Sequence, residues 1–146
     1  MNRDVFKRLS IRTVMLLPFL SSVLHSHGPR ECSNETIKGV YGYTITGLSP
    51  VPNAAGQFEQ LLGVGLRTHD GQGNFTQVQS EKRTSTPAVV DVQGAGTYSV
   101  NPDCTGTLTT AAGVQSRFVI VAKGKEIHWI VVSPPVLTIS GRATRR

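Results

Sequence analysis

The stretch GTYSVNPDCTGT, residues 96–107, contains the signals that decide the fold of this chain. Alternating β-branched and aromatic residues predict a strand, and Asn-Pro-Asp predicts a tight turn. A second strand is predicted to start just after Cys104. The only other cysteine, Cys32, lies early in the chain. Whether the two cysteines form a disulfide depends on whether the protein is in an oxidising compartment, and the N-terminal segment indicates which compartment that is.

Residues 1–28 have the composition of a secretory signal. Four basic residues within the first twelve positions precede an apolar run at residues 14–24 that is short for a bilayer span. An uncleaved anchor is the alternative. We expect a secreted or periplasmic protein that contacts the membrane only transiently, through this segment. In such a compartment Cys32 and Cys104 are expected to form a disulfide, closing a loop of about seventy residues.

The formal charge of +6 belongs to the two ends of the chain. Residues 29–141 carry eight basic and eight acidic side chains, and the excess lies in the signal segment and in a basic C-terminal tail (Arg142, Arg145 and Arg146). A nucleic-acid-binding domain would gather Lys and Arg on one face with interleaved aromatic residues. The neutral body therefore argues against a nucleic-acid partner.

Beyond the signal, β-branched and aromatic runs recur between clusters of Gly, Pro, Asn and Asp, without helical periodicity. They predict strands at residues 37–48, 58–68, 75–81, 88–92, 96–100, 105–111, 114–122, 126–132 and 136–142. Most connections are short turns, such as DGQGN at residues 70–74. We predict a single all-β domain over residues 29–146, an antiparallel meander of about eight strands closing into a small barrel. A two-sheet sandwich is the alternative.

The late strands are apolar on both faces. Ile127, Trp129 and Val131 alternate with Ile130 and Val132, whereas a strand with one wet face should alternate with polar residues. This pattern predicts that the outer face is covered, by a loop of this chain or by a second subunit. A homo-oligomer through residues 119–132 is therefore one expected partner.

Several of these segments together resemble a group of small secreted bacterial proteins. The matching segments are GVYGY at residues 39–43, LRTHDGQGN at 66–74, GTYSVNPDCTGT at 96–107 and GKEIHWI at 124–130. The group looks like the calycin or allene-oxide-cyclase type of small barrel, and the resemblance covers nearly the whole chain after the signal. It implies an eight-stranded barrel, but no activity and no catalytic residues, because its motifs are turn and strand signals.

Glu126 and His128 form the candidate acid–base pair. Two positions apart on a predicted strand, they share a face, and a carboxylate beside a histidine is what proton transfer near neutral pH requires. A solvent-facing polar pair is the alternative, since no nucleophile or second base accompanies them.

Five aromatic residues are candidates for lining the barrel interior and binding a ligand there. They are Tyr41, Tyr43, Phe58, Phe118 and Trp129. A barrel of eight strands is wide enough either to fill with side chains or to hold one small ligand. The glycines at positions 63 and 65 would leave room on whichever face they occupy, and core packing is the alternative role of the aromatic residues.

Neither a metal nor another cofactor is expected. Asp70, Gln72 and Asn74 alternate oxygen-bearing side chains, but Phe75 occupies the position where a calcium loop needs glycine, so a hairpin turn is favoured. The sequence predicts a binding module that takes either a small apolar ligand in its interior or a partner at its surface.

Two other functions remain open from the sequence. One is a cofactor-free isomerase or lyase of the barrel-cyclase type, and the other is a structural envelope component that assembles through its apolar outer strands. An open cavity with His128 pointing into it would favour an interior ligand or the enzyme. A filled interior would leave surface interaction.

Overall fold

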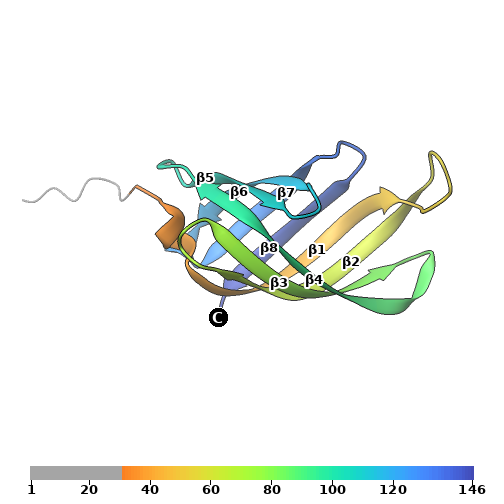
Figure 1. Cartoon of the computed structure of the whole chain (residues 1–146), viewed down its shortest axis with the longest axis horizontal. Coiled ribbons are helices and arrows are strands. Elements are labelled where there is room, and N and C mark those ends of the chain that lie inside the picture. The colour runs from red at the N-terminus through yellow and green to blue at the C-terminus, as the bar shows by residue number, and fades with distance from the viewer. Residues whose placement is uncertain (1–30) are drawn as a thin grey trace, which may run out of the picture.

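The computed structural model describes residues 31–146, and the predicted signal segment lies outside them. Eight antiparallel strands follow one another along the chain and close into a barrel, the last strand pairing with the first (Figure 1). The predicted all-β meander and barrel are therefore confirmed. The strands are β1 (Gly39–Pro50), β2 (Phe58–His69), β3 (Asn74–Arg83), β4 (Thr86–Val100), β5 (Thr105–Thr110), β6 (Gln115–Val121), β7 (Glu126–Ser133) and β8 (Thr138–Arg145).

Helical structure in the described part of the chain is limited to two short 3₁₀ turns, η1 (Asn34–Ile37) and η2 (Ala122–Gly124). Within residues 31–146 no helix has the length and apolar character needed to cross a membrane.

The largest differences from the predicted strand boundaries are in β4 and β8. β4 is one strand of 15 residues where two were predicted, because Gly94 and Gly96 stay in the ladder with β3. β8 extends to Arg145, past the predicted strand end at Arg142, so Arg145 belongs to the sheet and not to a basic tail. Arg145 is held there by a hydrogen bond: its Nε donates to the hydroxyl oxygen of Tyr41 at 3.1 Å.

The N-terminal segment closes one end of the barrel. η1 brings Ile37 into the interior, where it is completely buried. Cys32, just before η1, forms the predicted disulfide with Cys104 in the turn between β4 and β5, 72 positions further along the chain. The Cys32 amide also donates to the carbonyl oxygen of Pro102 at 3.0 Å. The disulfide therefore fixes the closing segment to the middle of the sheet.

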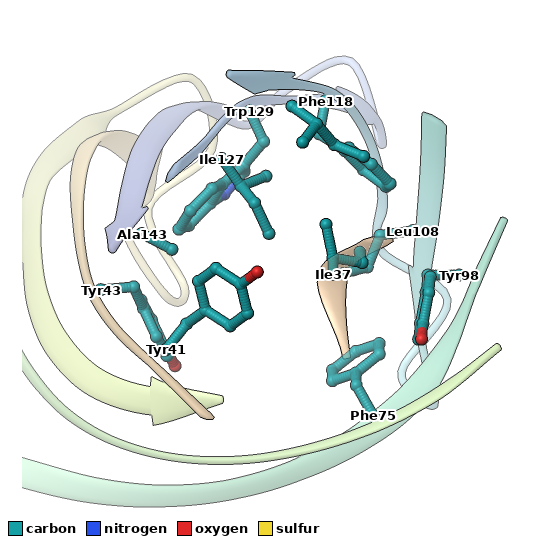
Figure 2. Packing of buried hydrophobic residues seen from close by; sticks show 11 residues of the cluster. Ile37, Tyr41, Tyr43, Phe75, Tyr98, Leu108, Phe118, Ile127, Trp129 and Ala143 are labelled. Carbon is teal, nitrogen blue, oxygen red and sulfur yellow. The ribbon is translucent and has the colours of Figure 1, made fainter. Parts of the chain in front are cut away.

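The interior is packed by aromatic rings that lie over glycines of the neighbouring strand, and Figure 2 shows several of these rings pointing inward. A Cβ atom on Gly106 would lie 2.5 Å or less from two atoms of the Phe118 ring, so the ring occupies the space that a side chain would need. Such glycines let a sheet curve strongly while the rings fill the gap. The pairs in which a ring lies over a glycine are Phe75 with Gly96, Phe118 with Gly106, and Trp129 with Gly141.

Candidate functional site

The part of the barrel interior that holds the predicted aromatic residues is filled. Tyr41, Tyr43, Phe118 and Trp129 are buried there as core side chains (Figure 2). The cavity beside Phe118 and Trp129 has a volume of about 10 Å³. This is room for roughly one water molecule, far below the several hundred Å³ of a site for an organic ligand. The geometry here favours the core-packing alternative.

Phe58 does not line the interior, so this part of the prediction is wrong. It lies on the outward row of β2 together with Leu62, and 52% of its surface is exposed. The inward row of the same strand contains Gly63 and Gly65. There is no room for a side chain at Gly63, because a Cβ there would lie 2.8 Å from the side chain of Ile45 on the neighbouring strand.

The interior also contains a cation, Arg67, that the sequence analysis did not identify. Its side chain is largely buried, and its Nε and Nη2 donate to Oε1 of Gln77 at 3.0 and 2.7 Å. The guanidinium lies 4.9–5.1 Å from the ring centroids of Tyr43, Phe75 and Trp129, within the range of cation–π attraction. Burial lowers the pKa of Arg67 to about 10, so it remains charged at neutral pH.

His69 lies two positions further along the same inward row. It is buried, and its ring packs edge-on against Tyr41 and Tyr98, with centroid distances of 5.3 and 5.0 Å. Burial lowers the pKa of His69 to about 3, and the positive charges of Arg67 and Arg145 contribute to the same shift. His69 is therefore neutral at physiological pH, and its Nδ1 has no hydrogen-bond partner among the described residues.

A row of polar side chains continues along the inward face of β3 toward the other end of the barrel. Gln77 donates to Gln79 at 3.3 Å, Gln79 donates to Glu81, and Arg83 donates to Glu81 at 3.3 Å. The hydroxyl of Tyr43 donates to Gln79, and burial raises the pKa of Tyr43 to about 12. These groups bond to one another, so the row stabilises the sheet rather than offering free groups to a ligand.

The predicted pair Glu126 and His128 is in contact, but it lies on the outside of the barrel. Nε2 of His128 contacts Oε1 of Glu126, and Nε of Arg142 lies 2.7 Å from the same oxygen. Desolvation raises the pKa of Glu126, but the hydrogen bonds from Arg142 and His128 outweigh it, and the pKa is lowered overall. The His128 side chain is 47% exposed. An open position of this kind does not exclude water from a reaction.

A broad groove crosses the outer face of the sheet. Its volume is about 1390 Å³, and its lining runs from β5 through β6, β7, β8, β1 and β2 to β3. Outward-pointing apolar side chains line it, each between 45% and 59% exposed, namely Leu62, Val64, Val119 and Ile130. Basic or titratable side chains lie among them, namely Lys82, Arg117, His128 and Arg142. The acidic lining residue Glu81 belongs to the inward row of β3 described above.

The exposed apolar residues of β6 and β7 agree with the expectation that these strands are apolar on both faces. Val119 and Ile130 remain 45% and 56% exposed, so no loop within residues 31–146 covers them. The covering element, if the protein has one, is outside the described residues or belongs to another molecule.

The DGQGN segment is the hairpin turn that the sequence predicts. Oδ1 of Asp70 accepts hydrogen bonds from the amides of Gln72 and Asn74 at 2.7 and 2.9 Å. The hydrogen bonds from Asn74 lower the pKa of Asp70 to about 2. Its carboxylate therefore stabilises the turn. Within residues 31–146, no group of three or more His, Cys, Asp or Glu side chains is arranged to hold a metal ion.

Comparison with protein-family models, with curated proteins and with solved structures finds no match to this chain. The function is therefore inferred from the barrel and its surface.

Proposed function

We propose that this protein is an exported binding module that recognises an acidic, partly apolar segment of a partner protein through the groove on its outer face. The observation that carries this proposal is the presence of exposed apolar side chains and cations in one groove. The apolar side chains form two groups, one on β2 and one on β6 and β7, with outward polar residues of β1 and β8 between them. Exposed apolar groups bordered by polar residues mark interaction sites. Leu62, Val64, Val119 and Ile130 point away from the core, so packing inside the barrel does not account for them.

The dimensions of the groove favour a segment of a macromolecule over a small ligand. Sites for small molecules are concave pockets of roughly 300–1,000 Å³ that enclose most of the ligand. This groove is larger, about 1390 Å³, and runs across strands from β5 to β3 on an outer face. An extended peptide can contact several strands at once along such a path.

The charge of the groove favours an acidic partner. Arg117 makes no ion pair with any residue in 31–146, and the side chain of Arg142 is 60% exposed although it binds Glu126. A symmetric dimer that paired this groove with itself would bring these cations together, and like charges across an interface are unfavourable. An acidic partner is therefore preferred to the expected homo-oligomer.

Export of the protein rests on two observations. Residues 1–28 have the order of a secretory signal, and the disulfide between Cys32 and Cys104 is typical of an oxidising compartment. The resemblance to small secreted bacterial barrels of the calycin or allene-oxide-cyclase type supports the same location. The barrel architecture agrees with that resemblance.

The two other functions considered from the sequence are less well supported. An isomerase or lyase using Glu126 and His128 would need an enclosed cavity, whereas His128 lies on the open outer face. An envelope component would use the same apolar surface, but it would require the protein to assemble with itself.

Two labelled peptides of equal length test the proposal, one alternating Leu with Glu and the other Leu with Lys. We expect the purified protein to bind the acidic peptide in a fluorescence anisotropy titration and to bind the basic peptide more weakly. Arg117→Glu should weaken acidic-peptide binding about fivefold, which corresponds to about 1 kcal/mol. Lys123→Glu is the matched control, because it makes the same charge change in the turn between β6 and β7, outside the groove.

Equal effects of Arg117→Glu and Lys123→Glu would contradict the proposal, because the groove would then contribute no more than overall charge. Sedimentation of the same samples separates the alternative. Concentration-dependent dimers that Val64→Asp dissociates would assign the groove to a second copy of the chain instead.

A further inference from the structure

The long strand β4 has a neighbouring strand on only one side along its first part. β3 pairs with β4 from Thr86 onward, whereas β5 pairs only with residues 96–100. The carbonyl oxygen of Ala95 still accepts a hydrogen bond at 2.8 Å from the amide of Ala111, in the turn after β5. Residues 86–94 therefore form a free edge of the sheet, and Figure 1 shows the β3–β4 hairpin extending beyond the short strands β5 and β6.

The backbone of this free edge carries hydrogen-bonding groups that no strand of residues 31–146 pairs with. In an antiparallel ladder the N–H and C=O of one residue point to the same side, and successive residues alternate. The pairing with β3 is regular from Val90 to Thr97, and the carbonyl of Ala95 points away from β3. The groups that point to the free side therefore belong to Val89, Asp91 and Gln93.

An edge of this length occurs once in the described part of the chain. Every other strand within residues 31–146 is paired along more than half of its length on both sides. The free edge is also apolar in part, because Val89 and Val90 are 60% and 49% exposed. A long exposed edge with β-branched residues is a template for pairing with another strand.

From this geometry we propose that the free edge of β4 pairs with the same edge of a second copy of the chain, antiparallel and centred on Val90. Val90 is the midpoint of residues 86–94, so a two-fold axis there pairs the whole of both edges. An axis moved toward Gly94 would place the second copy on Ala111, which already lies beside β4. An axis moved toward Thr86 would leave part of each edge unpaired.

The side chains of the edge favour the same register. An axis at Asp91 would place two carboxylates directly opposite each other, and like charges in that position are unfavourable. An axis at Val90 places Asp91 opposite Val89 of the partner subunit instead. It also brings the two Val90 side chains together, as a non-hydrogen-bonded pair on the inward face of the sheet. Because each copy has one such edge, the pairing closes at a dimer.

This proposal does not depend on the peptide that we propose for the outer groove. The groove lining includes one residue of the free edge, Val89, and its other exposed apolar residues lie on β2, β6 and β7. The edge dimer uses backbone groups of β4, so the two interactions can succeed or fail separately.

Oxidative cross-linking of Val90→Cys tests the register. The two native cysteines are bonded to each other, so the added thiol is the one that reacts. Cα atoms of a non-hydrogen-bonded pair are about 4.5 Å apart, which suits a disulfide. We expect a covalent dimer on a non-reducing gel. Ala88→Cys is the matched control, because it is equally exposed on the same row but lies opposite Val92 of the partner subunit. It should cross-link at least about tenfold more slowly.

Sedimentation of the purified protein between about 10 µM and 1 mM tests the dimer itself, and we expect reversible, concentration-dependent association. Val89→Pro removes a free-side N–H without removing a donor to β3, and it should raise the dissociation constant at least about tenfold. Circular dichroism checks that this variant folds. Val64→Asp, in the groove, should leave the dimer unchanged.

Three results would overturn the proposal: a monomer throughout that concentration range, equal cross-linking of Val90→Cys and Ala88→Cys, or dimers that Val64→Asp dissociates and Val89→Pro does not. If Val89→Pro does not fold, the comparison of the two cysteine variants still decides between pairing at the edge and random collision.

Discussion

Replacing Gly141 by alanine should destabilise the barrel strongly, although the substitution adds one methyl group. The new Cβ would lie 2.5 Å from Cε2 of Trp129 and closer still to Cζ2, and 2.7 Å from the carbonyl oxygen of Thr44. Carbon atoms in van der Waals contact are about 3.5–4.0 Å apart. The indole ring would therefore have to move by about 1 Å in an interior that is close-packed.

The expected cost is about 3 kcal/mol of the free energy of unfolding, the upper part of the range for overpacked cores. The upper part applies because the indole ring cannot move without disturbing other contacts. Tyr43 packs edge-on against it at a centroid distance of 5.8 Å, and the Arg67 guanidinium lies 5.1 Å from its centroid. For a domain of this size the thermal midpoint should fall by about 12 °C.

Urea denaturation followed by circular dichroism measures this effect, with Gly42→Ala as the control. Gly42 is also a strand glycine, but nothing lies within 4 Å of its added Cβ, so we expect a change of about 0.5 kcal/mol in the stabilising direction. Trp129→Leu removes the ring, and Gly141→Ala should cost at least about 1 kcal/mol less in that background. If Gly141→Ala lowers the free energy of unfolding equally in both backgrounds, the Trp129 ring does not pack against Gly141 as described.

Two further predictions concern the disulfide and His69. Replacing both Cys32 and Cys104 by serine should lower the free energy of unfolding by about 4 kcal/mol, the loop-closure value for a separation of 72 residues. A loss below about 1 kcal/mol in urea denaturation would contradict this prediction. His69 binds a proton below about pH 6.5 in the unfolded chain but only near pH 3 in the fold, so its contribution to stability should decrease as the pH falls through that interval. Its ring resonances should not shift between about pH 5 and 8 in an NMR titration, and a shift there would show that the ring is not buried as described.

The order of the strands was predictable because residues within each turn, such as Gly and Asn-Pro-Asp, identify that turn in the sequence. Gly71 and Gly73 adopt positive φ angles in the DGQGN turn, and Cys104 does so directly after Asn-Pro-Asp. Such positions mark chain reversals whatever the rest of the fold does. Short turns between strands leave a meander as the simplest arrangement, and the disulfide followed from the number of cysteines and the signal.

The inward face of β2 was not predictable from alternation of apolar residues. Phe58, Leu62 and Val64 form the apolar row, which periodicity alone assigns to the core. This row lies outside, because Ile45 of β1 and Gln79 of β3 take the space beside the inward row, and only a row with Gly63 and Gly65 leaves that space free. That inversion is long-range, since it depends on Ile45 and Gln79 of the two neighbouring strands.

The same inversion explains why alternation does not identify Arg67 and His69. They share the parity of Gly63 and Gly65, so both residues fall on the inward face once the glycine row is assigned to it. The rule that follows is a physical one. In a small barrel rich in glycine, the face that carries the glycines is a candidate for the interior, because large rings need a neighbour without a side chain.

This packing also connects the interior to the proposed binding surface. Rings over glycines fill the closed end of the barrel and leave a volume of about 10 Å³, so an organic ligand has no room there. The aliphatic residues of β2 lie on the outside, and they line one groove together with those of β6 and β7 and with Arg117 and Arg142. Exposing these residues to water weakens solubility without adding to the core. The partner proposed above would cover them, and the proposal in this way connects the packing of the inner face with the composition of the outer face.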